Sequence, residues 1–458
     1  MAARGERAGP ALSRRPGARG RRSAQDFRLV RFTYCDNANL IRAKAAPGER
    51  LDGHMRHGIG FSVAQQALPV MTDAVVPASG LGPVGEVYLV PDADTLTPLP
   101  FSPGQAIVLG DFQTAAGEPW AHCPRTFLAR QVAALGQAGF TPQAAFESEF
   151  YLLRQAGESW VPADDTNFAA GHAYDLAHPF LSDLLDALEA MGLAVHLVYP
   201  ESGPGQFEVS IQHAAGAGAA DRQVLFREAV RAVAARQGYR ASFAPKPLPE
   251  RAGSGCHLHL SLWQGRASAF ADPHDPLGLS RTAYHFMGGV LRHLPALAAI
   301  TLPSVNSYQR ILPHVWAGAF ACYGPENREA ALRVITPRRG PDSAHFELKA
   351  VDASSNPYLA LGAVLAAGLD GIRNRTDPGE PVTTDPGLIP QAEREARGIE
   401  QLPSTLGDAI ARLERDRVLL DALGDELARS FLAVRRREWE LLGSLSPEES
   451  ARAHLFRY

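Results

Sequence analysis

Apolar and polar residues alternate in several short stretches of the chain, most clearly between residues 146 and 153. This alternation, with its aromatic and leucine residues, predicts a β-strand. Because residues two apart share one face of a strand, Glu147 and Glu149 are expected to lie side by side in apolar surroundings. Two such carboxylates need a compensating charge, which a hard divalent cation would supply. The alternative is a half-exposed strand with a solvated acidic face.

Elsewhere the pattern predicts a β-rich unit followed by a longer unit of mixed strands and helices. The expected strands of the first unit cover residues 27–34, 40–44, 85–90 and 106–109. After a Gly- and Pro-rich boundary and a helix that begins at Pro124, the expected strands cover 193–199, 206–211 and 255–263, and the expected helices 175–191, 220–237, 405–420 and 423–442. This order indicates an α+β fold with an antiparallel sheet. We expect a disordered Arg-rich tail over residues 1–24, an N-terminal domain over 25–118 and a larger domain over 119–458.

Composition narrows the class of protein. The 458 residues are 45% apolar and 21% charged, which is typical of a globular protein. A formal net charge of -4 gives no electrostatic reason to expect a nucleic acid or an anionic membrane as partner. No apolar run reaches the roughly 20 residues of a membrane span. Four cysteines without CxxC spacing suit a reducing compartment, so we expect a cytoplasmic protein. A mitochondrial-type presequence is the alternative interpretation of the Arg-rich tail.

Two further stretches offer candidate ligands. Glu201 and Glu208 flank a Gly- and Pro-rich turn, which can fold both carboxylates back onto one point. A glycine-rich segment then leads into a predicted strand with His257, His259 and Ser261 on one face and leucines on the other. Each stretch alone also fits an ordinary polar strand face.

A fourth segment repeats this arrangement, with His345, Glu347 and Lys349 on one face. Four polar-faced strands fit a single sheet whose inner surface is polar. Five carboxylates and one histidine suit Mg²⁺ or Mn²⁺ better than zinc, which favours more nitrogen or sulfur.

Taken in order, these motifs resemble those of the glutamine synthetase family over almost the whole chain, from about Phe27 to Tyr458. The matching segments are Glu147–Phe150, Glu201–Glu208, Lys246-Pro247, Gly253–Ser261, Asn306–Arg310, Glu326–Arg333, and Glu347 followed by Asn356–Leu361. The resemblance implies a β-grasp-like N-terminal domain and a catalytic domain with a funnel-shaped antiparallel sheet flanked by helices. It also implies two divalent cations per site, with ATP as a co-substrate.

The resemblance further implies roles for single residues. One metal ion would be held by Glu149, Glu201 and Glu208, and the other by Glu147, His257 and Glu347. The nucleotide and its phosphates would contact His259, Ser261, Arg328 and Arg333. Arg310, with the backbone near Gly253, would bind the carboxylate of glutamate, and Arg310, Arg328 and Lys349 are the candidate catalytic residues. The implied reaction forms γ-glutamyl phosphate, from which an amine then displaces phosphate.

Two positions depart from the members that use ammonia. Those members carry an aspartate in a Phe-Asp-Gly-Ser-Ser stretch, whereas this chain has Ser62 there, and their glutamate six residues after the arginine is Trp316 here. Binding NH₄⁺ and accepting its proton needs anionic groups. An indole instead offers a wall for an alkyl or aryl group and a π-face for an amine cation. We therefore expect Ser62 and Trp316 to contact an amine larger than ammonia.

Lysine is rare in this chain. Of 45 basic residues only Lys44, Lys246 and Lys349 are lysines, so a retained lysine can mark a place where a compact ammonium is needed. Lys349 replaces an arginine that many family members use on glutamate, and we interpret it as functional. His345 replaces another arginine near the phosphates, and a packed histidine is an equally good interpretation.

The leading hypothesis is an ATP-dependent ligase that joins the γ-carboxylate of glutamate to an organic amine. The alternatives are an ordinary glutamine synthetase and a catalytically silent structural or regulatory member. The resemblance also implies a ring-shaped homo-oligomer, with each active site between one subunit's N-terminal domain and its neighbour's catalytic domain.

Overall fold

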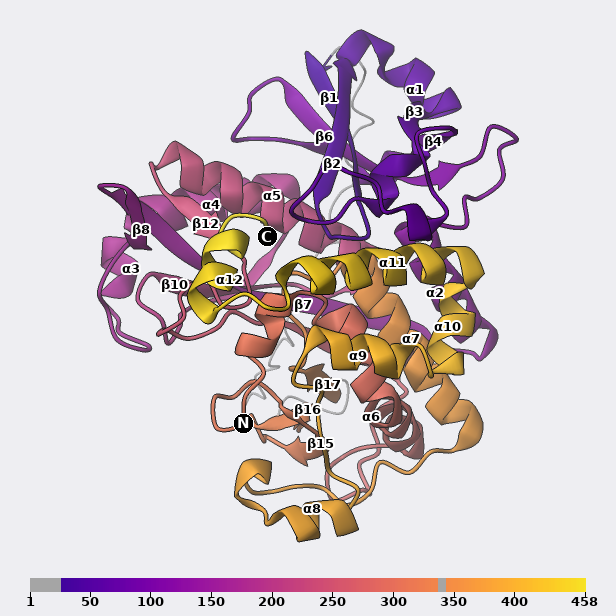
Figure 1. Ribbon diagram of the computed structural model, residues 1–458, viewed down its shortest axis with the longest axis vertical. Helices are drawn as coiled ribbons and strands as arrows, with labels where there is room; N and C mark the ends of the chain where they lie inside the picture. The colour runs from indigo at the N-terminus through magenta and orange to yellow at the C-terminus, as the bar shows by residue number, and fades with distance from the viewer. Residues whose placement is uncertain (1–25, 337–342) are drawn as a thin grey trace, which may run out of the picture.

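The computed structural model describes residues 26–336 and 343–458, so the predicted tail over 1–24 lies outside the described residues. The first unit is a mixed sheet with one α-helix, α1 (Leu51–His57) (Figure 1). Its strands are β1 (Leu29–Cys35), β2 (Ile41–Pro47), β3 (Ile59–Ser62), β4 (Glu86–Pro91), β5 (Thr97–Pro98) and β6 (Gln105–Gln113). They follow the order β2-β1-β6-β4-β3, with β5 beside β6 and with β1 parallel to β6.

The turn between β1 and β2 is built by its own polar residues. Oδ1 of Asp36 accepts hydrogen bonds from the backbone N–H groups of Ala38 and Leu40, each at 2.9 Å. An aspartate that binds the backbone two residues on closes a turn in this way. The two strands then pair antiparallel over their full length.

The larger unit is organised around a second sheet, which is built mainly from antiparallel pairs. Its strands are β7 (Thr141–Ala156), β8 (Ser159–Pro162), β9 (Val195–Pro200), β10 (Gln206–Ile211), β11 (Ala214–Ala215), β12 (Arg240–Ser242), β13 (Cys256–Gln264), β14 (Ala267–Ser268), β15 (Phe320–Pro325), β16 (Ala330–Ile335), β17 (His345–Leu348) and β18 (Glu400–Gln401). The main path is β18-β15-β16-β17-β13-β7-β10-β9. The expected antiparallel sheet is confirmed, except that β15 and β16 pair parallel.

Alternation along the strands separates a polar face from a buried face. On β13 the leucines at 258, 260 and 262 are buried, while His257 and His259 face the opposite side. The predicted strand over 146–153 lies within the longer β7, and the prediction over 206–211 coincides with β10. The polar face therefore gathers the candidate ligands.

Helices flank this sheet. They are α2 (Pro124–Gln137), α3 (Ala173–Leu176), α4 (His178–Met191), α5 (Gly218–Arg236), α6 (Arg281–Thr301), α7 (Pro357–Asn374), α8 (Gln391–Ala396), α9 (Leu406–Leu413), α10 (Arg417–Leu423), α11 (Asp425–Leu442) and α12 (Pro447–His454). The helix expected over 405–420 is wrong as one element: it is α9 and α10, because Asp416 caps the N-terminus of α10. The motif that follows Glu347 begins α7, with Asn356 as its N-cap.

Helix α11 joins the two units. It runs between the N-terminal sheet and the helices α9 and α10 in Figure 1. Glu438 accepts a hydrogen bond from the backbone of Val70 at 2.7 Å, and the side chain of Asn37 donates to Ser430 at 3.1 Å. The expected boundary at residue 118 lies in the segment between β6 and α2.

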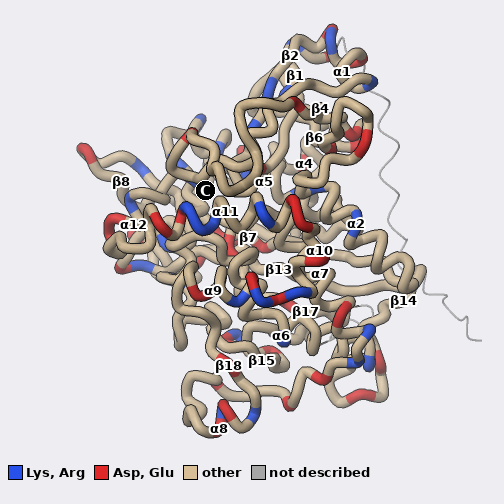
Figure 2. Tube along the Cα trace, turned by 45° about the vertical axis from the view of Figure 1, so that its right-hand side comes forward, with Lys and Arg blue, Asp and Glu red and all other residues tan. Residues whose placement is uncertain are grey.

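Residues of both signs of charge are distributed along the described chain. Figure 2 shows Lys and Arg residues interspersed with Asp and Glu along the described trace in its view. No helix among residues 26–336 and 343–458 is both long enough and apolar enough to cross a membrane.

Candidate active site

Strand register brings the candidate ligands together. Four neighbouring strands, in the order β17-β13-β7-β10, carry all of them but Glu201, which directly follows β9, the neighbour of β10. Glu208 pairs with Glu149 across β10 and β7, and His257 pairs with Glu147 across β13 and β7. On the other edge of β13, His259 pairs with Glu347. Paired residues on one face of a sheet have side chains within contact distance, so the sheet itself assembles the cluster.

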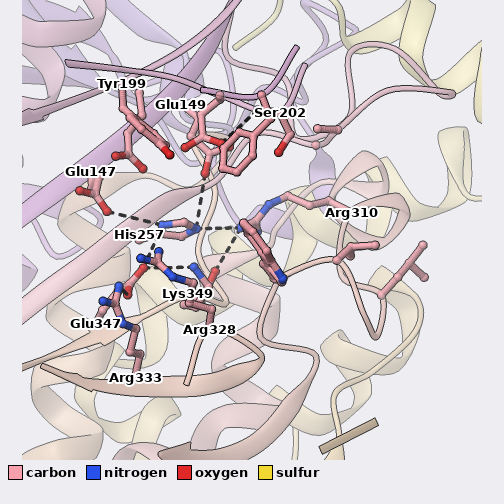
Figure 3. A pocket seen from close by; sticks show the side chains of 18 of the residues that line it. Glu147, Glu149, Tyr199, Ser202, His257, Arg310, Arg328, Arg333, Glu347 and Lys349 are labelled. Atoms are coloured by element: carbon pink, nitrogen blue, oxygen red, sulfur yellow. Dashed lines mark hydrogen bonds and ion pairs between the residues drawn. The ribbon is translucent and has the colours of Figure 1, made fainter. Parts of the chain in front are cut away.

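His257 lies at the centre of this cluster. Its Nδ1 is 3.0 Å from Oε1 of Glu347 and 3.8 Å from Oε2 of Glu147, and its Nε2 is 3.6 Å from Oε1 of Glu149. Nε2 of His259 lies 3.2 Å from Oε2 of Glu147. Figure 3 shows Glu147 and Glu149 on one side of His257, with Glu347 on the other.

Two groups of side chains have the spacing of metal ligands. Glu147, Glu208 and His257 place ligand atoms within 4.8 Å of one another, and so do Glu147, His259 and Glu347. These groups overlap the two predicted sets but differ from them, because His259 joins Glu347 and His257 joins Glu208. Glu149 and Glu201 line the same cavity without belonging to either group. The assignment of ligands to each ion stays a prediction.

The carboxyl groups of the cluster have pKa values shifted in different directions by burial and by neighbouring charges. Burial raises the pKa of Glu208 to about 10, with a further contribution from Glu147. Burial and then the charge of Glu149 raise the pKa of Glu201 to about 7. Burial also opposes the ionisation of Glu347, but Lys349 and His257 hold the pKa of this carboxyl well below its usual value.

These properties fit hard divalent cations. The donors are carboxylate oxygens and imidazole nitrogens, which Mg²⁺ and Mn²⁺ accept. The buried Nδ1 of His257 has no aligned hydrogen-bond partner. A nearby cation would favour the ionised form of Glu208 and Glu201, whose pKa values burial and neighbouring carboxylates raise.

Basic side chains border the cluster beside Glu347 and His257. Nη1 of Arg333 lies 3.2 Å from Oε2 of Glu347, and Nζ of Lys349 lies 3.2 Å from Oε1 of the same carboxylate. A guanidinium nitrogen of Arg310 donates to Nε2 of His257 at 3.1 Å. Gly253 packs against Arg310, since a Cβ atom at residue 253 would lie 2.7 Å from its Cγ.

Thirteen of the predicted site residues line one cavity of about 1080 Å³, which we call the main cavity. They are Glu147, Glu149, Glu201, Glu208, Gly253, His257, His259, Arg310, Trp316, Arg328, Arg333, Glu347 and Lys349. The two others, Ser62 and Ser261, do not line it. Ser261 accepts a hydrogen bond from the indole of Trp263 at 3.0 Å, and Ser62 lies in β3 of the first sheet.

The structure also adds residues that the sequence did not single out. Phe168, Tyr199, Ser202, Arg251 and Gln309 line the main cavity. Tyr199 stands two residues before Glu201, so its place on the strand that leads to this carboxylate was a usable signal. Phe168 lies in an irregular segment without a motif, and only the tertiary fold brings it to the cavity.

His345 is held as a neutral, packed side chain. Its Nδ1 donates to the carbonyl of Ser343 at 2.7 Å, and its ring lies 5.3 Å from that of His259. Burial, followed by the charge of His259, lowers the pKa of His345 to about 4. A neutral imidazole does not replace the charge of an arginine.

Comparisons with known proteins agree with this geometry. The family model of the glutamine synthetase catalytic domain matches residues 121–452, and that of the glutamine synthetase N-terminal domain matches residues 18–120. The chain therefore belongs to the glutamine synthetase family, and its class is that of an ATP-dependent carbon–nitrogen ligase. Members of this family use ATP and divalent cations, with glutamate and either an amine or ammonia.

Relatives within the family differ in the product or the amine that their names specify. A γ-glutamylpolyamine synthetase of Streptomyces coelicolor is 39% identical, over 96% of this chain and 95% of the relative. A glutamine synthetase of Halobacterium salinarum is 38% identical, over 94% of each chain. A glutamate–methylamine ligase of Methyloversatilis universalis is 34% identical, over 89% of this chain and 91% of the relative. A crystal structure of a glutamine synthase homolog superimposes with a TM-score of 0.84 at 35% identity, covering 94% of this chain and 99% of the other.

Proposed function

We propose that this protein joins the γ-carboxylate of glutamate to an organic amine. The observation that carries the proposal is Trp316, which lines the main cavity where ammonia-using members carry a glutamate. The side chain of Trp316 offers an apolar ring and no proton acceptor, so this position cannot bind NH₄⁺ through a carboxylate. Two relatives named for organic amines support the proposal.

The proposed reaction has two steps. A γ-carboxylate oxygen of glutamate attacks the γ-phosphorus of ATP, the bond to the bridging oxygen breaks, and ADP leaves. The amine nitrogen then attacks the carbonyl carbon of γ-glutamyl phosphate. The bond between this carbon and the phosphate oxygen breaks, inorganic phosphate leaves, and the nitrogen loses one proton. Both steps need positioning and charge neutralisation more than covalent help from the protein.

Basic residues of the main cavity suit these needs. We assign the glutamate α-carboxylate to Arg310, which is only 6% exposed and whose guanidinium faces the cavity beside His257. Arg328 and Arg333 also line the cavity, and we assign them, with His259 and Ser261, to the nucleotide and its phosphates. Lys349 is 4% exposed and places a compact positive charge beside Glu347.

We also propose that two divalent cations, Mg²⁺ or Mn²⁺, are held by Glu147, Glu149, Glu201, Glu208, His257 and Glu347. When bound, they would supply positive charge to the phosphate oxygens. The raised pKa values of Glu201 and Glu208 support this assignment, because burial and neighbouring carboxylates disfavour the ionised forms and a bound cation would offset both.

Glutamine synthetase activity is the second candidate. The Halobacterium salinarum relative, with 38% identity over 94% of each chain, favours it. On this alternative, ammonia would be held by groups other than residues 62 and 316.

Phosphate release separates the two candidates. Purified protein would be given ATP, glutamate and Mg²⁺ or Mn²⁺, with a panel of organic amines and ammonium at one pH. Strong stimulation by an organic amine and little by ammonium is the expected result. Ammonium as the best substrate would instead establish glutamine synthetase activity and overturn the proposal.

We further propose a ring-shaped homo-oligomer in the cytoplasm, with domains over 25–118 and 119–458. The position of Ser62 supports an active site between subunits, because this residue lies outside the main cavity of its own chain. Light scattering on the purified protein would test the oligomeric state, and a monomer would contradict it.

A further inference from the structure

Exposed apolar side chains gather at the mouth of the main cavity. Ten large apolar side chains are exposed in the described part of the chain, and half of them line this one cavity. These five are Phe168 (41% exposed), Leu197 (47%), Leu312 (47%), Val315 (56%) and Trp316 (50%). Apolar side chains gathered around a functional cavity mark a binding surface rather than random exposure.

Three aromatic rings form the centre of this surface, and we call them the aromatic wall. The ring of Phe168 stands edge to face against Tyr199, with centroids 5.7 Å apart, and against Trp316, with centroids 5.8 Å apart. Such contacts stabilise the mutual positions of the rings. The wall therefore runs without a break from Trp316 to Tyr199, on the strand that leads to Glu201.

The backbone at Trp316 holds the indole in place. Its φ angle is 59°, in the left-handed region that bulky residues seldom adopt. The backbone N–H of Trp316 donates to Oε1 of Glu329 at 2.7 Å, and Nδ1 of the nearby His314 lies 2.7 Å from Oδ2 of Asp385. Two polar contacts thus fix the loop that carries one end of the aromatic wall.

We propose that the aromatic wall binds the hydrocarbon part of the amine co-substrate. The amine it fits is a primary amine whose nitrogen carries an alkyl or aryl substituent several carbon atoms long. The reacting nitrogen would lie near Tyr199 and the carboxylate cluster, and the substituent would cover Phe168 and Trp316. This inference rests on the proposed function, and it adds the binding surface and the size of the substituent.

A series of n-alkylamines tests the wall directly. Amines from methylamine to hexylamine have similar nitrogen chemistry but different apolar area. With glutamate and ATP saturating, kcat/KM for the amine should rise about fourfold per added methylene, because each fully buried methylene contributes a similar free energy. KM for glutamate should stay constant along the series.

Substitutions at Phe168 test whether this dependence on the chain length of the amine comes from the aromatic wall. Phe168→Ala should flatten the increase with chain length, whereas Phe168→Leu should retain part of it. Leu185→Ala is the matched control, since Leu185 is 40% exposed on α4 and does not line the main cavity. That variant should keep the full dependence on chain length. Circular dichroism and thermal unfolding would verify that each variant folds.

The possible outcomes distinguish a failure of this inference from a failure of the proposed ligase function. If methylamine works as well as hexylamine, and Phe168→Ala changes neither, the wall is not an amine site although the ligase function stands. If no organic amine exceeds ammonium, the proposed function itself fails. If Phe168→Ala dissociates an oligomer in light scattering while amine preference is unchanged, the surface is an interface between copies, and the inference is overturned.

Discussion

The two sides of the main cavity are carried by different kinds of structure. On the side that gathers the candidate metal ligands, Glu208, Glu147, His257 and Glu347 stand on adjacent strands at paired or neighbouring register positions. On the side of the aromatic wall, Phe168 and Trp316 stand on irregular segments. Only Tyr199 stands on a strand, and that strand, β9, ends the main path of the sheet.

This difference places the candidate metal ligands on the sheet and the proposed choice of amine mainly on loops. Sheet positions are fixed by hydrogen-bonded neighbours on both sides, so the ligand cluster keeps one geometry. Loops tolerate substitution more readily, so the choice of amine can change without disturbing that cluster. The relatives, whose names specify glutamine, methylamine or a polyamine although their sequences are 34% to 39% identical to this chain, are consistent with this division.

The largest loss of activity should come from a substitution among the candidate ligands that the sheet carries. Glu347→Ala removes a buried carboxylate that contacts His257, Arg333 and Lys349. ATP-dependent phosphate release should fall at least about 100-fold, because a proposed metal ligand is lost and the two side-chain cations Arg333 and Lys349 are left without their partner. Glu158→Ala, in the exposed turn after β7, should keep the full rate. An unchanged rate in Glu347→Ala would exclude this carboxylate from the reaction.

The sheet-borne side was largely predictable from the sequence. Period-two alternation placed His257 and His259 on one face of β13 and the leucines on the other, and the structure agrees. Strand geometry alone determines that result, so a short segment suffices. The grouping of ligands was less predictable, because it depends on which strands are neighbours and on their register.

Other features could not be read from local patterns. Helix α6 has apolar residues on most of its circumference and contains Pro295, which ordinarily argues against a helix. The aromatic wall unites Phe168, Tyr199 and Trp316 from three distant segments, and Phe168 carried no sequence signal. Contacts between distant loops depend on the completed tertiary structure.

The next effect should come from changing the loop-borne side. Trp316→Glu restores a carboxylate at the position where ammonia-using members carry one. The ratio of kcat/KM for ammonium to kcat/KM for the best organic amine should rise about 10- to 100-fold, because the site gains a cation partner and loses an apolar surface. Steady-state phosphate release with both amines measures this ratio.

Trp316→Gln is the control that separates the two contributions. It removes the ring and adds no charge, so it should weaken use of the organic amine without improving use of ammonium. An equal gain for ammonium in both variants would mean that size, and not charge, excludes ammonium from the wild-type site.

A smaller effect should come from Lys349, whose Nζ lies 3.2 Å from Oε1 of Glu347. Lys349→Arg keeps the charge but replaces a compact ammonium with a planar fork in a site that is only 4% exposed. We expect kcat/KM for glutamate to fall about tenfold, because the larger group would disturb Glu347. The exposed substitution Arg436→Lys should leave this constant unchanged. Full activity in Lys349→Arg would show that the rarity of lysine carries no functional information.

The smallest effect, on thermal stability, should come from a residue outside the main cavity, in the helices that flank the sheet. His293 on α6 is buried between Asp416, whose Oδ2 lies 2.6 Å from Nδ1, and Asp370, whose Oδ2 lies 3.2 Å from Nε2. Burial opposes its protonation, but the two carboxylates outweigh burial and raise the pKa of His293. A raised pKa in the folded state means that protonated His293 stabilises the fold below its ordinary pKa, and that this stabilisation is lost as pH rises through the raised value.

Thermal unfolding of His293→Gln against the wild-type protein tests this sign. The variant should have a Tm about 2 °C lower at pH 6, and the difference should shrink as the pH rises through the raised pKa of His293. His178→Gln, at an exposed position on α4, should show no such trend. Amine preference should be unchanged in both variants, because neither residue lines the main cavity. A Tm difference that is independent of pH would mean that His293 stabilises the helical layer through packing and neutral hydrogen bonds, without contributing charge.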